Sequence, residues 1–289
     1  MDLITKKTLD SKLSYNESLY NTTLEILKIQ RSNLYKIYPQ IGYGDEGSVH
    51  KYDDLTALKI FMFIKKELLP NKYKKLEVFG KYRDESFCFP KGLVGYEDEQ
   101  KEGYFTDLVI TDGKLKTFDQ LTFLKDIRQL IKYLLKANVA IERIHKEGFI
   151  IGDVKSDNIM IDIHGNPRFV DVDNYAFEDF DFDVFPGRRD WFKRIFGKDC
   201  SPVDSDNFLY AMMCLQYFAY GTLLDQARTP TYFNTLIKLL DIDLESKEIL
   251  KIIFSDAENK PSIGPVLKKI NPEVKILTKN DIQILNRIY

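Results

Sequence analysis

The stretch Gly152–Asn158 reads G-D-V-K-S-D-N, and Asp171 follows it after a short hairpin signal. Asp153 supplies a carboxylate that can accept a hydroxyl proton, and Lys155 supplies a cation that can neutralise phosphate charge. Asn158 and Asp171 supply an amide oxygen and a second carboxylate that can hold Mg²⁺. Since phosphoryl transfer depends on positioning and on charge stabilisation by groups of this kind, the stretch indicates a phosphoryl-transfer site.

A glycine-rich stretch lies upstream. Gly42–Val49 reads G-Y-G-D-E-G-S-V between two predicted strands, which disfavours a dinucleotide-binding turn because that turn needs a strand followed by a helix. A hairpin without bulky side chains can lay backbone N–H groups over phosphates, although an ordinary glycine hairpin has the same pattern. Asp45 and Glu46 at its tip would repel phosphate, so we expect both side chains to point to solvent.

A lysine lies within an apolar strand pattern, in the sequence Ala57-Leu58-Lys59. Burying an ammonium group without a partner is costly, and phosphates together with a carboxylate would supply partners. Glu77, on a helix predicted over residues 72–82, is the expected carboxylate, and Glu67, only eight residues from Lys59, is a weaker candidate. A surface ion pair of little energetic value is the alternative interpretation of Lys59 and Glu77.

Secondary-structure signals divide the chain into a strand-rich part and a helical part, which predicts an α+β fold. The first part has one helix and expected strands at residues 35–40, 49–52, 55–61 and 103–110. Thr111-Asp112-Gly113 is a turn signal and the expected hinge. The second part has a long amphipathic helix that stops at Gly148, then a hairpin of strands 159–163 and 168–172. Further helices are expected at 207–220, with Asp206 as its cap, and at 232–240, 246–254 and 264–270.

The two ends of the chain carry fewer signals. Residues 1–33 are polar except for a short amphipathic stretch (Leu24, Ile26, Leu27 and Ile29), which predicts a helix packed on the main body or a mobile arm. No role can be assigned to residues 271–289.

Composition narrows the functional classes. A net charge of −2 gives no basic field for nucleic acid, and no apolar run of membrane-spanning length or signal peptide occurs. We therefore expect a cytoplasmic protein without a membrane or nucleic-acid partner. Three cysteines without paired spacing predict free thiols, and three histidines make a histidine-based metal centre improbable.

Over roughly residues 34–270 the chain resembles a eukaryotic-type protein kinase domain. The glycine-rich stretch, the A-L-K strand and D-V-K-x-x-N occur in that family's order. Asp206 resembles the aspartate that braces the backbone of the catalytic loop, and Lys260-Pro261-Ser262 resembles a late R-P-S/T signature with lysine for arginine. The resemblance implies a bilobal fold with an N-terminal extension (1–33), a small β-rich N-lobe with one helix (34–110) and a larger, mostly helical C-lobe with a tail (111–289).

The resemblance also implies roles for individual residues, with ATP and Mg²⁺ as cofactors and a protein as substrate. Asp153 would orient the acceptor hydroxyl and take its proton, and Lys155 would lie against the γ-phosphate. Asn158 and Asp171 would bind Mg²⁺. The implied nucleotide-binding residues are Gly42, Gly44, Gly47, Val49, Ala57, Lys59, Glu77 and Asp107. Turn formation by Asp153 and Asn158, and loop capping by Asp171, are the alternatives without function.

Departures from the family pattern leave three functions open. Ile151-Gly152 stands where His-Arg is usual, and Asp171-Val172-Asp173 stands where D-F-G is usual. Asp173 either adds a metal-facing carboxylate or restricts the loop. A Ser/Thr-type protein kinase is the first hypothesis, a small-molecule kinase with the related H-G-D motif is the second, and a non-enzymatic pseudokinase scaffold is the third. Oligomeric state and substrate identity stay open.

Overall fold

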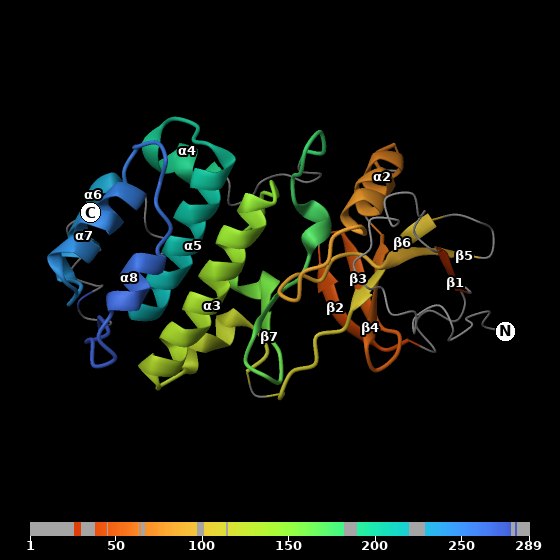
Figure 1. Ribbon diagram of the computed structural model, residues 1–289, viewed down its shortest axis with the longest axis horizontal. Coiled ribbons are helices and arrows are strands. Elements are labelled where there is room, and N and C mark those ends of the chain that lie inside the picture. Colours follow the sequence, from red (N-terminus) through yellow and green to blue (C-terminus); the bar gives the residue numbers. More distant parts are fainter. Residues whose placement is uncertain are drawn as a thin grey trace. The chain divides into compact units, whose positions relative to one another are not determined.

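The computed structural model describes residues 26–29, 38–44, 46–62, 64, 67–96, 101–113, 115–181, 190–219, 229–278 and 281. They form a mixed α+β structure, which confirms the predicted class. The chain divides into two compact units (Figure 1). A sheet unit holds the described residues up to Ile110 together with Val170–Asp173, and a helical unit holds residues 111–169 and 174 onward. Among the described residues, no helix combines the length and apolar character needed to cross a membrane.

Six strands build the sheet in the order β1-β5-β6-β4-β3-β2. Their bounds are β1 Ile26–Ile29, β2 Gln40–Gly44, β3 Gly47–Lys51, β4 Thr56–Phe61, β5 Gly92–Tyr96 and β6 Lys101–Asp107. Strands β2 to β6 pair in antiparallel fashion, and β4 is buried along its whole length at the centre. Lys59 therefore comes from the best-protected strand of the sheet.

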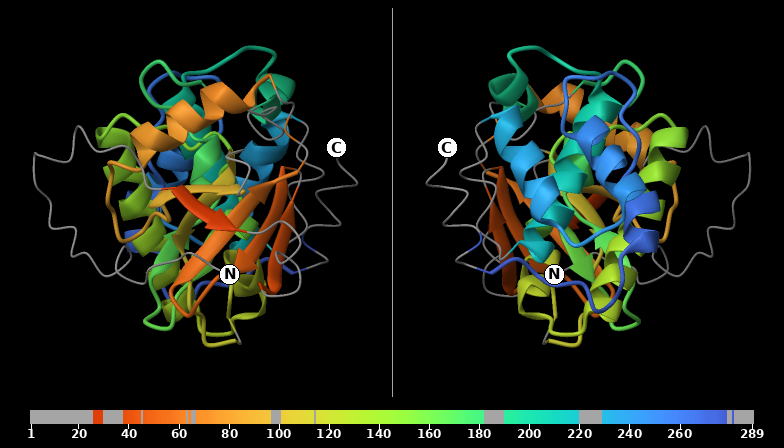
Figure 2. Two further views of the ribbon diagram at one scale, coloured as in Figure 1. Left: turned by 90° about the vertical axis from the view of Figure 1, so that its right-hand side faces the viewer. Right: turned by 90° about the vertical axis from the view of Figure 1, so that its left-hand side faces the viewer.

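Strand β1, drawn in red at one edge of the sheet in Figure 2, pairs with β5 in parallel, with Ile26 opposite Leu93 and Ile29 opposite Tyr96. The prediction of a helix around Ile26, Leu27 and Ile29 is therefore wrong. A run as short as I-L-K-I fits either period, and pairing with an available sheet edge decides between them. The segment assigned to an N-terminal extension thus contributes a strand. Residues 1–25, which include Leu24 of the predicted amphipathic stretch, lie outside the described residues.

Helix α2 (Leu69–Phe79) packs on the sheet unit. It begins earlier than expected because Pro70 is tolerated in the first helical turn, and it ends at Gly80. Its buried face consists of Lys72, Tyr73, Lys75, Leu76 and Phe79. Tyr73 and Leu76 join Phe61, Leu93 and Tyr104 in one core cluster. Two lysines thus lie on the face that the helix turns inward.

The helical unit is organised around two long helices, α3 (Ile127–Lys146) and α5 (Pro202–Phe218). Asp126 caps α3 by accepting hydrogen bonds from Arg128 N and Gln129 N, and Gly148 ends it with φ +90°, as the basic residues before a glycine predicted. The remaining elements are β7 Ile159–Ile161, β8 Pro167–Phe169, α4 Asp190–Phe196, α6 Pro230–Leu239, α7 Leu244–Ile253 and α8 Gly264–Lys269. The β7–β8 hairpin and the three later helices agree with the sequence pattern.

Helix α5 corrects one expectation. Ser201 is its N-cap and accepts a hydrogen bond from Asp204 N, while Asp206 lies inside the helix and is completely buried. Pro202 sets the start of the helix earlier than the apolar pattern suggested. Asp206 is consequently available for contacts outside its own helix.

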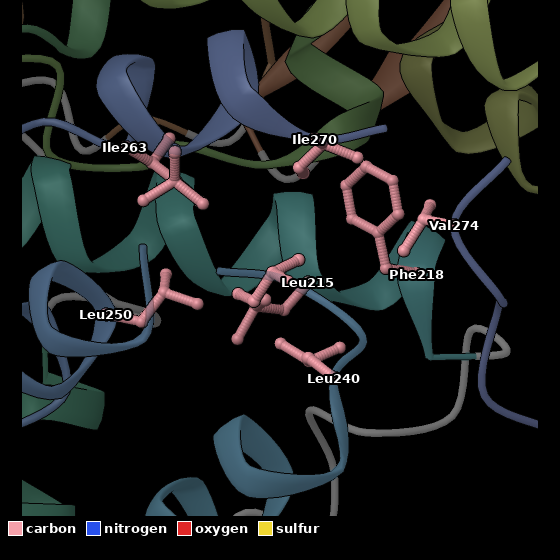
Figure 3. Close-up of a pocket in the computed structure, with 9 residues that line it drawn as sticks. Leu215, Phe218, Leu240, Leu250, Ile263, Ile270 and Val274 are labelled. Carbon is pink, nitrogen blue, oxygen red and sulfur yellow. The ribbon is translucent and has the colours of Figure 1, made fainter. Parts of the chain in front are cut away.

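Apolar side chains enclose a small pocket in the helical unit (Figure 3). It has a volume of about 10 Å³ and is lined by Leu215, Phe218, Leu240, Ile242, Leu250, Ile263, Val266, Ile270 and Val274. None of the described residues turns a polar group toward it to hold a water molecule, so it is a gap in the packing of the core around α5.

Candidate phosphoryl-transfer site

The loop after α3 places the D-V-K-x-x-N residues in the helical unit. Val154 is buried and anchors the loop, while the neighbouring side chains of Asp153 and Lys155 are partly exposed. Lys155 Nζ lies 2.7 Å from Asp153 Oδ2. Asn158 Nδ2 donates to Asp153 Oδ2 at 3.3 Å, which leaves the Asn158 amide oxygen as a possible ligand atom. The three residues predicted from the sequence thus lie together.

The carboxylate of Asp206 braces the backbone of this loop through hydrogen bonds. Its Oδ2 accepts from Ile151 N and its Oδ1 from Gly152 N, both at 2.8 Å, and His145 Nε2 lies 2.9 Å from Oδ2. Gly152 has φ +75°, a left-handed conformation that a bulky side chain would strain. Backbone geometry therefore accounts for a glycine at position 152, and the expected bracing role of Asp206 is confirmed.

Replacing Asp206 by alanine should destabilise the fold and release the loop. Two buried N–H groups would lose their acceptor, at about 1–3 kcal/mol for each unsatisfied donor. Urea unfolding followed by circular dichroism measures this loss. Asp256→Ala, which removes an exposed carboxylate paired with Lys198, is the matched control and should leave the midpoint unchanged. Equal midpoints for both variants would contradict the bracing role.

Lys59 forms the centre of a buried ion-pair network in the sheet unit. Its Nζ lies 2.8 Å from Asp173 Oδ1 and 3.1 Å from Glu46 Oε2, and it also pairs with Asp171. Lys72 Nζ lies 2.8 Å from Glu46 Oε1 and 2.9 Å from Asp173 Oδ2. Each lysine thus contacts both buried carboxylates, and the network satisfies the requirement that buried charges be paired.

Tyr104 and Phe61 complete the surroundings of the network. Tyr104 Oη donates to Asp173 Oδ1 at 2.7 Å. The ring of Phe61 lies under both ammonium groups, 5.0 Å from Lys72 Nζ and 5.9 Å from Lys59 Nζ. Asp173 is fully buried, whereas the Asp171 side chain is 31% exposed. Asp171 is therefore the carboxylate of this group that can meet a ligand.

The network moves the pKa values of its members in different directions. Burial by itself would raise the pKa of Asp173, but Lys59 and Lys72 hold it well below its usual value. Burial and the repulsion of Asp173 raise the pKa of Glu46 despite its two lysine partners. Burial disfavours the charged form of Lys59, yet Asp173 and Asp171 raise its pKa well above the usual value. Ionisation is therefore less favourable for Glu46 than for Asp173.

Glu46 corrects the expectation that the tip of the glycine-rich turn faces solvent. Its side chain is 8% exposed and is turned toward both lysines. Gly47 makes this possible: a Cβ at that position would lie 1.9 Å from the carbonyl oxygen of Ile60, so only glycine lets the turn approach β4 so closely. Asp45 lies outside the described residues.

Glu77 is not the partner of Lys59, which corrects a second expectation. Within the described part of the chain, Lys59 pairs with the carboxylates of Glu46, Asp171 and Asp173. Glu77 is half-buried and lies off the inward face of α2, where its helical position turns it away from the stripe that carries Lys72. Helix α2 thus contributes the cation Lys72 to the network, and the glycine-rich turn contributes the carboxylate of Glu46.

The other predicted nucleotide-binding residues lie on the sheet. Gly42 pairs with Val49 and Gly44 with Gly47 across β2 and β3, and Ala57 is buried on β4. Asp107 ends β6 and forms an ion pair with Lys91. The sequence did not identify Lys72 or Tyr104 as members of the site. The available signal for Lys72 was a lysine at a position on the buried face of α2, where an apolar residue is usual.

Carboxylate oxygens for a cation are present in the sheet unit. Glu46, Asp171 and Asp173 each offer one oxygen, and these oxygens lie within 4.8 Å of one another. Two of the three carboxylates are also paired with both lysines, so Asp171 is the member best suited to a hard cation such as Mg²⁺. Its φ of +63° is a conformation that aspartate tolerates better than most residues.

No protein-family model matches the chain. Among curated proteins, Serine/threonine-protein kinase PSK2 of Saccharomyces cerevisiae is similar to it, with 28% identity over 126 residues. The match covers 43% of this chain and only 11% of that protein. The similarity gives weak support to kinase activity, and most of the length of that protein has no counterpart in the match.

Proposed function

We propose that the chain transfers the γ-phosphoryl group of ATP, with Mg²⁺, to serine or threonine hydroxyls of a protein substrate. The observation that carries the proposal is the loop in which Asp153, Lys155 and Asn158 contact one another on a backbone held by Asp206. The partial similarity to a Ser/Thr kinase agrees with this assignment. We also propose that the two units are the N-lobe (34–110) and C-lobe (111–289) of a kinase-like fold.

The proposed roles follow from the chemistry of each side chain. Asp153 accepts the proton of the attacking hydroxyl, and its contact with Lys155 orients the carboxylate. Lys155 neutralises charge on the transferring group. Asn158 and Asp171 would hold Mg²⁺ through their oxygens, and the ion would supply charge neutralisation to the phosphates. Lys59 would bind phosphate oxygens.

One observation favours a second candidate, a pseudokinase scaffold. Lys59 is fully engaged by Glu46, Asp171 and Asp173, so a nucleotide must compete with carboxylates for this ammonium group. A small-molecule acceptor in place of a protein is the remaining alternative, and Gly152-Asp153 is the feature in its favour.

Transfer of labelled γ-phosphate from ATP, to the protein itself and to a generic basic protein, tests the proposal. Asp171→Asn should abolish the label, because an amide is a far weaker ligand for Mg²⁺ than a carboxylate. Asp181→Asn, at an exposed position, is the control and should keep the wild-type rate. Label on neither protein, with Mg²⁺-dependent ATP binding, would favour the scaffold or a small hydroxylated acceptor. Label retained by Asp171→Asn would overturn the assigned role.

A further inference from the structure

The carboxylate of Glu46 bridges two lysines. Its Oε1 lies 2.8 Å from Lys72 Nζ and its Oε2 lies 3.1 Å from Lys59 Nζ. The lysines come from different elements, α2 and β4, and their side chains are only 1% and 9% exposed. Two oxygens of a phosphate group can contact the two ammonium groups as the two oxygens of Glu46 do. Lysine suits this role because it binds phosphate as a point charge.

Asp173 allows the two ammonium groups to lie close together. Its Oδ1 faces Lys59 and its Oδ2 faces Lys72, and the Tyr104 hydroxyl donates to it as well. Because Asp173 is fully buried and is held by both lysines and the Tyr104 hydroxyl, it stays the counter-ion of the pair. Glu46 approaches the same lysines from the glycine-rich turn and is less deeply buried than Asp173. The two carboxylates therefore differ in how firmly they are held.

The turn that carries Glu46 lies beside an exposed edge strand. Strand β2 is exposed at most of its positions, and a Cβ on Gly44 would meet nothing within 4 Å. The carbonyl oxygen of Glu46 accepts a hydrogen bond from Met62 N at 2.9 Å, which is a contact of the backbone and not of the carboxylate. Displacement of its side chain removes no residue from the core clusters of the sheet unit.

We propose that Lys59 and Lys72 form a two-lysine clamp for a phosphate group of a nucleoside triphosphate, and that Glu46 is a tethered anion which occupies the clamp until phosphate displaces it. The proposal rests on the proposed function for the identity of the ligand. It assigns a phosphate contact to Lys72 and a competitive role to Glu46, so that the glycine-rich turn sets the affinity of the site as well as its shape.

Inorganic tripolyphosphate is the probe, because it carries the phosphate charges without the base or the sugar. Titration calorimetry compares its binding to the wild-type chain and to Glu46→Gln. If Glu46 occupies the clamp in nine molecules of ten, its neutralisation should tighten binding about ten-fold, since apparent affinity scales with the competent fraction. Asp54→Asn removes a carboxylate from an exposed ion pair with Lys51 and is the matched control, with unchanged affinity expected.

A charge-balanced double variant tests Lys72 without leaving a buried charge unpaired. Glu46→Gln with Lys72→Met removes one anion and one cation, so Lys59 and Asp173 stay paired, and thermal unfolding checks that the variant folds. The gain of Glu46→Gln should disappear in it. Either a retained gain in the double variant or no gain in Glu46→Gln overturns the clamp. Labelled transfer is measured separately: transfer without a gain refutes the clamp alone, and a gain without transfer refutes the proposed function alone.

Discussion

Replacement of Asp173 by asparagine should lower the free energy of unfolding by about 3–5 kcal/mol, the range for breaking a buried ion pair from one side. Asp173 contacts both Lys59 and Lys72 and is fully buried, so its loss leaves two adjacent buried ammonium groups to share Glu46 and Asp171. Chemical denaturation at pH 7 measures the change. A large effect would show that Asp173 is a structural anchor of the network.

Glu46→Gln is the contrasting variant within the same network. Burial and the repulsion of Asp173 already raise the pKa of Glu46, so its charge contributes less to stability than that of Asp173. We expect Glu46→Gln to change the unfolding free energy by no more than about 1 kcal/mol, in the range of an ordinary single hydrogen bond. Equal losses in the two variants would contradict the ranking of the two carboxylates.

The free energy of unfolding at acidic pH supplies an independent measurement of the role of Asp173. Because its folded pKa lies well below the ordinary value of 3.8, the stabilisation is present at pH values above the unfolded pKa and is lost as pH falls through the folded pKa. The difference in stability between the wild type and Asp173→Asn should therefore shrink only below about pH 4. Glu46 contributes with the opposite sign, since its folded pKa is raised.

Asp153→Ala should lower the rate of phosphoryl transfer by about 10²–10⁴-fold, the contribution of a positioned proton acceptor. Asp153 contacts Lys155 and Asn158 through one carboxylate oxygen, so its loss also removes the group that orients both neighbours. Steady-state transfer to a generic basic protein gives the rate, and the variant should leave the thermal midpoint close to the wild-type value because the side chain is partly exposed.

Asp157→Ala is the matched control for Asp153→Ala. It lies in the same loop, but its side chain is exposed. We expect a rate close to that of the wild type. Comparable losses in both variants would show that loop structure, and not the Asp153 carboxylate, limits the reaction. An unchanged rate in Asp153→Ala would remove the residue from its assigned role.

Local patterns in the sequence anticipated the parts of the site that lie close together along the chain. Asp153, Lys155 and Asn158 meet because a short loop with a buried Val154 leaves few other arrangements. The helix α3 and its stop at Gly148 followed from period and capping chemistry, which act over a few residues. Asp206 was recognised as the brace only through a resemblance, since nothing local ties it to the backbone of Ile151 and Gly152.

The partners of Lys59 could not be found in this way. The sequence alone determined that the lysine of an apolar strand needs an anion, but it pointed to Glu77 and placed Glu46 in solvent. Tertiary structure decided among them. The close approach at Gly47 brings Glu46 over β4, and the inward face of α2 presents Lys72 in place of Glu77. Ion pairing between residues far apart in sequence depends on how backbones approach one another, and periodicity within a single element does not record that distance.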